Sequence, residues 1–359
     1  MLIIILVIIG LSLLILGHEA GHFFAAKSFG LKVDEFGFGF PPRIKAWKKG
    51  DTEYSINWLP FGGFVKIGGE RGEFEMLNPD GTEKNGTVAN GAQQKTPDES
   101  RLFYAQPAWK KSVIMLAGVF MNFVLGWLFV SITLMIGAPQ ALIISGIQPN
   151  SPAAQAGIMS GDVVEHFSTA QSFIDFVNAH RGQQTAVSVI RNNKEINFTV
   201  TPRVQTAANE GAVGVELAET GTPREGFFAA LGDGFLNAAI ILWLTIGAFW
   251  QLIAQLFAHA SLLPGVVGPV GIFGLAEETG KIGMVYLLQL LGVISLNLTV
   301  VNLIPFPALD GGRFVMAIVE KIKGSAIPYK VEAWVNGIGF ALLIILMILL
   351  TVRDVSGLI

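Results

Sequence analysis

The feature that most constrains this chain is a set of three ionisable side chains inside its first apolar run. The run extends from Leu2 to about Ala26 and is long enough to cross a membrane, yet it contains His18, Glu19 and His22. A charged side chain at membrane depth costs at least ~2.5 kcal/mol, so such residues are functional-site hypotheses by default. The fold must therefore supply partners for these groups inside the membrane.

The spacing of the two histidines indicates a chemistry. His18-Glu19-Ala20-Gly21-His22 is an H-E-x-x-H pattern, and positions i and i+4 of a helix share a face, so both imidazoles point the same way. Two such histidines beside a glutamate form the zinc arrangement of a metalloprotease, with the glutamate as general base. The alternative is a chance match on a soluble helix. Chance does not explain ionisable groups in a run of leucine and isoleucine.

Composition places the chain among integral membrane proteins. Hydrophobic residues make up 52% and charged residues 14% of the 359 residues, and the mean hydropathy is +0.55. The net charge of −3 gives no basic bias toward nucleic acid. There is no cysteine, so disulfides and thiolate ligands are excluded and a metal would be held by histidine and carboxylate. The first run lacks a basic segment before it, so we expect it to be retained rather than cleaved as a signal peptide.

These properties predict a polytopic α-helical membrane protein. It has about four transmembrane helices, a cytoplasmic membrane-associated β-sheet and an inserted extracytoplasmic domain. The predicted segments are transmembrane helix 1 (1–26), a cytoplasmic β region with a flexible loop (27–111), transmembrane helix 2 (112–136), a small extracytoplasmic domain (137–204), a linked strand and an outer-surface or re-entrant amphipathic helix (205–284), transmembrane helix 3 with an aspartate ligand (285–312), a cytoplasmic loop (313–333) and transmembrane helix 4 (334–353).

The distribution of basic residues sets the orientation. Residues 27–111 hold 13 of the 24 lysines and arginines, so the positive-inside rule makes this stretch cytoplasmic and the N-terminus external. Residues 33–67 alternate in short runs broken by glycine and proline, which predicts strands and turns. Residues 70–100 are polar and rich in glycine and asparagine, which predicts a flexible loop. In the inserted domain we expect a helix near 170–180 and strands at 186–191 and 195–201.

A zinc ion held by two histidines needs a third protein ligand. The best candidate is Asp310, which ends the run Asn302-Leu303-Ile304-Pro305-Phe306-Pro307-Ala308-Leu309-Asp310. Irregular backbone at membrane depth is tolerated where it lines a cavity or is buried in protein. The alternative is that Asp310 merely caps the next helix.

Topology tests this assignment. His18 and His22 lie near the cytoplasmic end of their helix, so Asp310 can reach them only if the helix before it runs inward. Residues 235–258 must then not cross the membrane, although their length would allow it. If they crossed, Asp310 would lie ~30 Å from the histidines. We therefore expect four spans, with five as the alternative.

Together these motifs resemble the bacterial site-2 protease family, the intramembrane zinc metalloproteases, most closely the RseP type. The resemblance covers nearly the whole chain. It includes H-E-A-G-H at residues 18–22, F-G-G-F-V-K at 61–66, S-P-A-A at 151–154, Gly268-Pro269, and N-x-x-P-x-P-x-L-D-G at 302–311.

The resemblance implies a full set of site residues. His18, His22 and Asp310 would bind Zn2+, and Glu19 would be the catalytic acid/base. The substrate backbone would be held beside the zinc by Asn302, Pro305 and Pro307. The strands at 33–67 look like the membrane-associated sheet of that family, which receives unwound substrate by strand addition.

The inserted domain, 137–204, looks like a single PDZ domain that filters substrates by size on the outer face. Many members of this type carry two such domains. Residues 165–168 also stand where a PDZ domain usually shows an Asn-Gly turn, which leaves its peptide binding open.

The function that follows is hydrolysis of peptide bonds within or near transmembrane segments, as in regulated intramembrane proteolysis. The implied partners are the lipid bilayer and single-span membrane proteins, such as trimmed anti-sigma factors or remnant signal peptides. The implied location is the bacterial inner membrane, as a multi-pass protein with the N-terminus and PDZ domain outside. A non-catalytic PDZ scaffold with a structural metal is the alternative, but a structural site needs no base such as Glu19. A metal transporter is disfavoured because no inverted repeat is visible.

Two asparagines lie at membrane depth outside these motifs, Asn122 and Asn297. We expect them to hydrogen-bond across helices, which is the commoner role. Facing the cavity is the alternative.

Overall fold

The computed structural model describes residues 2–70, 99–191, 194–206, 211–259 and 268–356. The chain divides into two compact units. Unit 1 comprises Met1–Ser131 and Leu231–Ile359, and unit 2 comprises Ile132–Ala230. The predicted flexible loop at 70–100 falls almost entirely outside the described residues.

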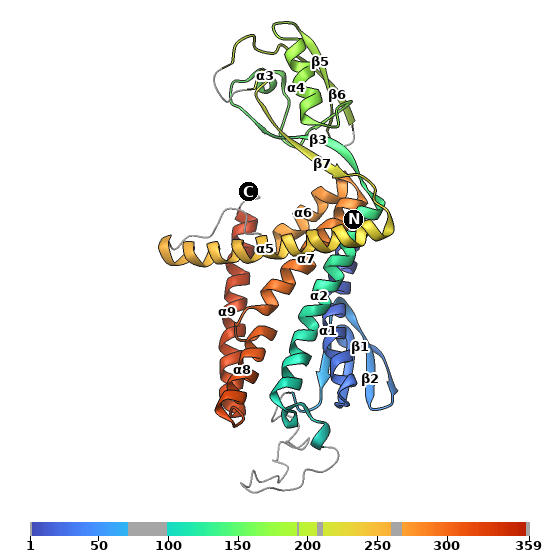
Figure 1. Cartoon of the computed structure of the whole chain (residues 1–359), viewed down its shortest axis with the longest axis vertical. Coiled ribbons are helices and arrows are strands. Elements are labelled where there is room, and N and C mark those ends of the chain that lie inside the picture. Colours follow the sequence, from blue (N-terminus) through green and yellow to red (C-terminus); the bar gives the residue numbers. More distant parts are fainter. Residues whose placement is uncertain (1, 71–98, 192–193, 207–210, 260–267, 357–359) are drawn as a thin grey trace. The chain divides into compact units, whose positions relative to one another are not determined.

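Unit 1 is mostly helical (Figure 1). Within the described part of the chain, five helices are long and apolar enough to cross a membrane. They are α1 (Leu2–Ser28), α2 (Ala108–Ile136), α5 (Phe227–His259), α7 (Met284–Leu303) and α9 (Tyr329–Ser356). A helix pairs all of its backbone groups internally, which is why apolar runs in lipid take this form. The prediction of a helical membrane fold is confirmed, whereas helix length alone does not decide how many of the five cross.

Helix α5 lies across its neighbours rather than alongside them (Figure 1). Trp127 of α2 donates a hydrogen bond of 2.9 Å to the carbonyl of Leu231, and Thr245 hydrogen-bonds Asn297 of α7 at 2.8 Å. Most of the helix is otherwise exposed. Residues 235–258 thus contact the bundle at these points, and Asn297 bonds across helices as predicted.

The remaining helices of unit 1 are short. α6 (Pro269–Ile282) packs against α1 and α7 through a buried cluster of Val7, Ala276 and Leu287. α8 (Asp310–Lys323) precedes α9, and two 3-10 turns, η1 (Glu99–Arg101) and η2 (Phe103–Ala105), precede α2.

The end of the third predicted span needs correction. We expected one helix over 285–312 and a loop over 313–333, but α7 ends at Leu303 and Asp310 begins a separate helix, α8. Pro305 and Pro307 cause the break, because proline lacks an N–H and disfavours helical backbone in the residue before it. The aspartate is therefore the first residue of a helix rather than part of a span.

Residues 33–67 form one long antiparallel hairpin instead of several short strands. β1 (Val33–Lys49) pairs with β2 (Thr52–Ile67), with several register shifts along the ladder. β2 lies against α1: the hydroxyl of Ser12 donates to the carbonyl of Pro60 and accepts from the N–H of Gly62 at 3.4 Å. The hairpin therefore runs beside the helix that carries the H-E-x-x-H motif.

Unit 2 is a five-stranded antiparallel sheet with two helices. The strand order is β6-β5-β4-β3-β7. The elements are β3 (Ala138–Ile147), α3 (Pro152–Ala156), β4 (Val163–Val164), α4 (Ala170–Ala179), β5 (Thr185–Arg191), β6 (Lys194–Val200) and β7 (Val215–Thr222). The predicted helix and two strands of this domain agree with α4, β5 and β6 to within one residue.

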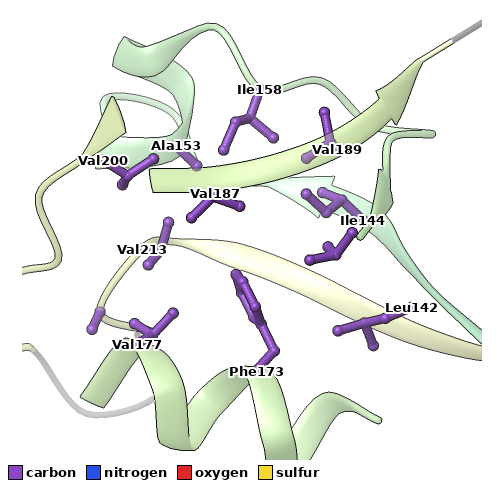
Figure 2. Close-up of a cluster of buried hydrophobic side chains, with 12 residues drawn as sticks. Leu142, Ile144, Ala153, Ile158, Phe173, Val177, Val187, Val189, Val200 and Val213 are labelled. Carbon is purple, nitrogen blue, oxygen red and sulfur yellow. The ribbon is translucent and has the colours of Figure 1, made fainter. Parts of the chain in front are cut away.

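The core of unit 2 lies between the sheet and α4. Phe173 of α4 points toward Ile144 and Val187 of the strands, and Val177 lies beside Val213 (Figure 2). The linked strand expected after residue 204 is β7, which pairs with β3 and so belongs to this sheet. The compact unit therefore extends beyond the predicted range of 137–204.

Candidate metal centre

Two histidines and one aspartate converge in unit 1. His18 Nε2 lies 3.1 Å and His22 Nε2 3.3 Å from Asp310 Oδ2, and the two imidazole nitrogens are 3.2 Å apart. Among the described residues, this is the one group of three or more potential ligands whose donor atoms lie within 4.8 Å of one another. The structure thus brings together the three residues that sequence reasoning selected.

The donor atoms fit a bound cation. The Nδ1 atom of His22 lies 2.8 Å from the carbonyl of Ile114, so in the neutral ring this nitrogen carries the proton and Nε2 carries a lone pair. Asp310 Oδ2 is buried and makes no hydrogen bond to the described part of the chain. Two acceptors that face each other at 3.3 Å repel unless a proton or a metal ion lies between them. Two imidazoles and a carboxylate also match catalytic zinc sites, which leave one position for water.

Glycine residues allow α1, the helix that carries both histidines, to approach α2 closely. The two imidazoles lie one turn apart on α1, and a Cβ at Gly118 of α2 would be 2.3 Å from His22 Nε2 and 2.8 Å from His18 Cε1. A Cβ at Gly21 would be 2.4 Å from the carbonyl oxygen of Ala117. Because real contacts are never this short, the helices can meet only at glycine. Sequence reasoning missed Gly118. The one feature of the sequence that pointed to it is an Ala-Gly pair within an apolar helix.

The loop between α7 and α8 sets the position of Asp310. Ala308 has a positive φ of 72°, and its N–H donates to Oδ1 of Asn336 in α9 at 3.1 Å. A Cβ at Gly311 would be 2.3 Å from the carbonyl oxygen of Ile304, and one at Gly312 would be 2.2 Å from that of Phe306. The first turn of α8 therefore folds back on the end of α7, and only glycine fits there after the aspartate.

Glu19 lies beside the ligands, half-buried on α1. Its Oε2 accepts a hydrogen bond of 3.1 Å from the backbone N–H of Val65 in β2. Its carboxylate lies close enough to His18, His22 and Asp310 to interact with them electrostatically. The hairpin thus contacts the predicted general base directly, through the F-G-G-F-V-K segment.

The predicted substrate-binding residues all lie in the α7–α8 connection. Asn302 is half-buried in the last turn of α7, and Pro305 is exposed. Pro307 packs against α9, where a Cβ at Gly339 would be 2.5 Å from its side chain. The structure places these residues on the segment that carries Asp310; their role with substrate stays a prediction.

Asn122 of α2 contacts the motif on α1. Its side chain is almost fully buried, at 1% exposure, and its amide nitrogen lies 3.0 Å from His18 Nδ1. Its backbone carbonyl accepts a hydrogen bond of 2.7 Å from Ser295 of α7. Asn122 thus bonds across helices, as predicted, and its partner is one of the candidate metal ligands.

Comparison with known proteins gives one consistent result over nearly the whole chain. Residues 6–346 match the family described as Peptidase family M50. A relative from Clostridium perfringens is 32% identical over 358 residues, which cover 98% of each chain. The regulator of sigma-W protease RasP of Bacillus subtilis is 29% identical, and the zinc metalloprotease RasP of Bacillus licheniformis is 28% identical, each over 96% of both chains.

Proposed function

Since the chain belongs to peptidase family M50, the site-2 proteases, and is a zinc metalloprotease, we propose that it hydrolyses peptide bonds within or near transmembrane segments. The substrates are single-span membrane proteins, such as anti-sigma factors already trimmed by another protease, or remnant signal peptides. The name of the Bacillus subtilis relative, regulator of sigma-W, supports the first of these classes. The observation that carries the proposal is the convergence of His18, His22 and Asp310 beside Glu19.

His18, His22 and Asp310 hold the zinc in this proposal. Their donor atoms lie within 4.8 Å of one another, and the unpaired Oδ2 of Asp310 faces both imidazoles. When bound, zinc lowers the pKa of a coordinated water toward neutrality and polarises the scissile carbonyl. The three residues leave the fourth position to water and substrate, as catalytic sites do.

Glu19 moves the proton. Its carboxylate takes a proton from the attacking water and passes it to the leaving amine. The hydrogen bond from the Val65 N–H fixes one carboxylate oxygen and leaves the other for this transfer. Since Val65 lies in β2, the proton-transfer group is held by the same strand that lies along α1.

The α7–α8 connection and the hairpin handle the substrate backbone. A transmembrane helix hides its peptide bonds in its own hydrogen bonds, so cleavage requires local unwinding. The side-chain amide of Asn302 makes no hydrogen bond within the described residues, so it is available to a substrate backbone group. The hairpin would receive the unwound strand by edge addition.

Unit 2 is proposed to be a PDZ domain on the outer face that limits substrate size. Its support is a five-stranded sheet with a cavity of about 430 Å³ lined by α4 and residues 211–217. β7 pairs with β3 on one side, and α4 lies across the cavity from it. We place this unit and the N-terminus outside the inner membrane.

The test of the function is cleavage of a single-span substrate in detergent by a Glu19→Gln variant. Glutamine keeps the shape of the side chain but cannot take up a proton, so the cleavage rate should fall by about 10²- to 10⁴-fold. Zinc content should remain that of the wild type. The matched control is Glu278→Gln, because Glu278 is an exposed carboxylate on α6.

Cleavage by Glu19→Gln at the wild-type rate would remove Glu19 from the mechanism. A His18→Ala variant tests the ligand set separately, because it should lose zinc and activity together. Wild-type zinc affinity in that variant would contradict the proposed site.

A further inference from the structure

The two proposed histidine ligands differ in the group that lies within hydrogen-bond distance of their Nδ1 atom, the ring nitrogen that does not face Asp310. A neutral imidazole has one N–H and one lone pair, so only a ring protonated at Nδ1 can offer Nε2 to a metal. For His22 the carbonyl of Ile114 fixes this state, because a carbonyl can only accept. For His18 the corresponding neighbour is the side-chain amide of Asn122, which can either donate or accept.

The orientation of the Asn122 amide therefore decides whether His18 can act as a ligand. With its NH2 group toward Nδ1, the amide donates and the His18 proton must lie on Nε2, where a metal would bind. With its oxygen toward Nδ1, the amide accepts and Nε2 is free. The two orientations differ by a half-turn about the Cβ–Cγ bond.

The burial of Asn122 makes this choice consequential. The side chain is 1% exposed, and in the present orientation its Oδ1 is buried without a hydrogen-bond partner in the described part of the chain. An unpaired buried acceptor is costly. Turning the oxygen to the His18 ring pairs that acceptor, moves the NH2 group into the place the oxygen held, and gives both imidazoles the same protonation pattern.

We propose that Asn122 is a positioning residue that accepts a hydrogen bond from His18 Nδ1–H and so keeps His18 Nε2 free for zinc. This inference rests on the proposed zinc site. The hydrogen bond from Ser295 goes to the backbone carbonyl of Asn122 and not to the side-chain amide. Groups of this kind beside a metal ligand affect metal affinity by about 10- to 100-fold.

The experiment measures zinc affinity by chelator competition, on the full-length protein in detergent, for Asn122→Asp and Asn122→Leu. An aspartate carboxylate can only accept, so Asn122→Asp should bind zinc as tightly as the wild type or more tightly. Leucine has a similar size but no acceptor, so Asn122→Leu should lose about 10- to 100-fold in affinity. Replacing zinc with Co2+ adds a second readout: the visible spectrum should stay tetrahedral in Asn122→Asp and weaken in Asn122→Leu.

Two further variants separate the explanations. Ser295→Ala removes the neighbouring contact between α2 and α7 and leaves the Asn122 side chain in place, so it should keep wild-type zinc affinity. His18→Ala tests the site itself. If His18→Ala loses zinc while Asn122→Leu keeps it, this inference fails and the proposed function stands; if His18→Ala keeps zinc, the site itself is wrong.

Asn122→Asp decides the question even if Asn122→Leu does not fold. A loss of zinc affinity in Asn122→Asp would mean that the amide donates to His18 or merely fills space, which would overturn the inference. Wild-type affinity in both variants would overturn it as well.

Discussion

At the scale of single residues, the proposed metal centre depends on glycines, which have no side chain, as much as on its proposed ligands. Gly118 leaves room for both imidazoles against α2, and Gly311 and Gly312 let α8 begin directly under the end of α7. Interiors this close-packed do not absorb an extra methyl group without displacement. The smallest side chains at the site are therefore among its most restricted positions.

Gly118→Ala should abolish stoichiometric zinc binding, because the new Cβ would lie 2.3 Å from His22 Nε2 and displace that ring. Metal analysis of the purified variant checks this. Gly337→Ala is the control, since a Cβ at Gly337 of α9 meets nothing within 4 Å and alanine favours a helix by about 1 kcal/mol. Full zinc content in Gly118→Ala would show that the helices separate easily at this point.

Glu35 makes the stability of the β1–β2 hairpin depend on pH. Its carboxylate is buried and accepts hydrogen bonds from Lys66 at 2.6 Å, Ser55 at 2.7 Å and Arg43 at 2.7 Å. Burial alone would raise the pKa of Glu35, but the Lys66 and Ser55 hydrogen bonds and the nearby positive charges outweigh it and hold this pKa below its ordinary value. The folded state thus favours the ionised form, and that stabilisation is present above the unfolded-state pKa of about 4.3.

Glu35→Gln should therefore destabilise the hairpin by about 2 kcal/mol at pH 7, the scale of a hydrogen bond to a charged group. The difference from the wild type should shrink as the pH falls from about 5 to about 3, because the wild-type carboxylate is then protonated. Amide hydrogen exchange in β1 and β2 measures this difference in stability. Glu53→Gln serves as control, since Glu53 is 39% exposed and should contribute under about 1 kcal/mol. A difference that stays constant down to pH 3 would contradict the assignment.

Sequence reasoning selected the three residues of the candidate metal centre but not the residues that surround them. His18 and His22 could be read from one turn of helix, and Asp310 from its position after an apolar run broken by two prolines. Gly118 and the contact made by Asn122 lie on another helix, and no spacing rule connects them with His18. Contacts between distant segments depend on packing, which local pattern does not encode.

At the scale of elements, α6 is held at its first turn by the end of α9. The Asp354 carboxylate accepts from the N–H groups of Gly268 at 3.2 Å and Gly271 at 2.8 Å, which satisfies donors that a helix start leaves unpaired. A Cβ at Gly268 would lie 2.6 Å from Asp354 Oδ2. The Gly268-Pro269 pair noted in the sequence is thus explained as a helix start capped from another helix.

Asp354→Ala should loosen the first turn of α6 by about 1 kcal/mol, the usual value of a helix cap. Hydrogen exchange at the Ile272 amide, which bonds to the Gly268 carbonyl, should accelerate about fivefold. Ser356→Ala is the control, because the Ser356 hydroxyl bonds only within its own helix. Unchanged exchange in Asp354→Ala would mean that packing on α1 and α7 holds the turn by itself.

The ends of helices and strands could be predicted where a local signal, such as a proline, stops the element. They could not be predicted where contacts with other elements lengthen it. Prolines mark the end of α7, and the alternation in unit 2 gives β5 and β6. The β1–β2 hairpin packs against α1, a contact that a local window of sequence does not contain.

At the scale of the whole molecule, the helix directions limit the topology. Val7, early in α1, packs with Leu287, early in α7, while His18 and His22 meet Asp310 just after α7 ends. α1 and α7 therefore run parallel. α2 runs opposite to α1, since residues early in α2 contact Gly21. The chain between α2 and α7 must then cross the membrane an even number of times. α6, with 14 residues, is too short to cross, so we expect α5 not to cross.

Single cysteines test this topology cleanly because the chain has none of its own. Glu278→Cys, on α6, should react with a membrane-impermeant maleimide in intact cells, and Ser325→Cys, between α8 and α9, should react only after lysis. Both positions are exposed. The reverse pattern would mean that α5 crosses or that the whole protein is inverted, and protection of both sites in intact cells would mean that α7 does not cross.

The proposed catalytic groups lie far apart in the sequence, with His18, Glu19 and His22 about 290 residues before Asp310. A ribosome makes the first three long before the fourth. A chain still under synthesis, with its early helices already in the bilayer, consequently lacks a complete centre. The newborn enzyme has no means of cutting the helices that are entering the membrane around it, and becomes active only when its own assembly is nearly finished.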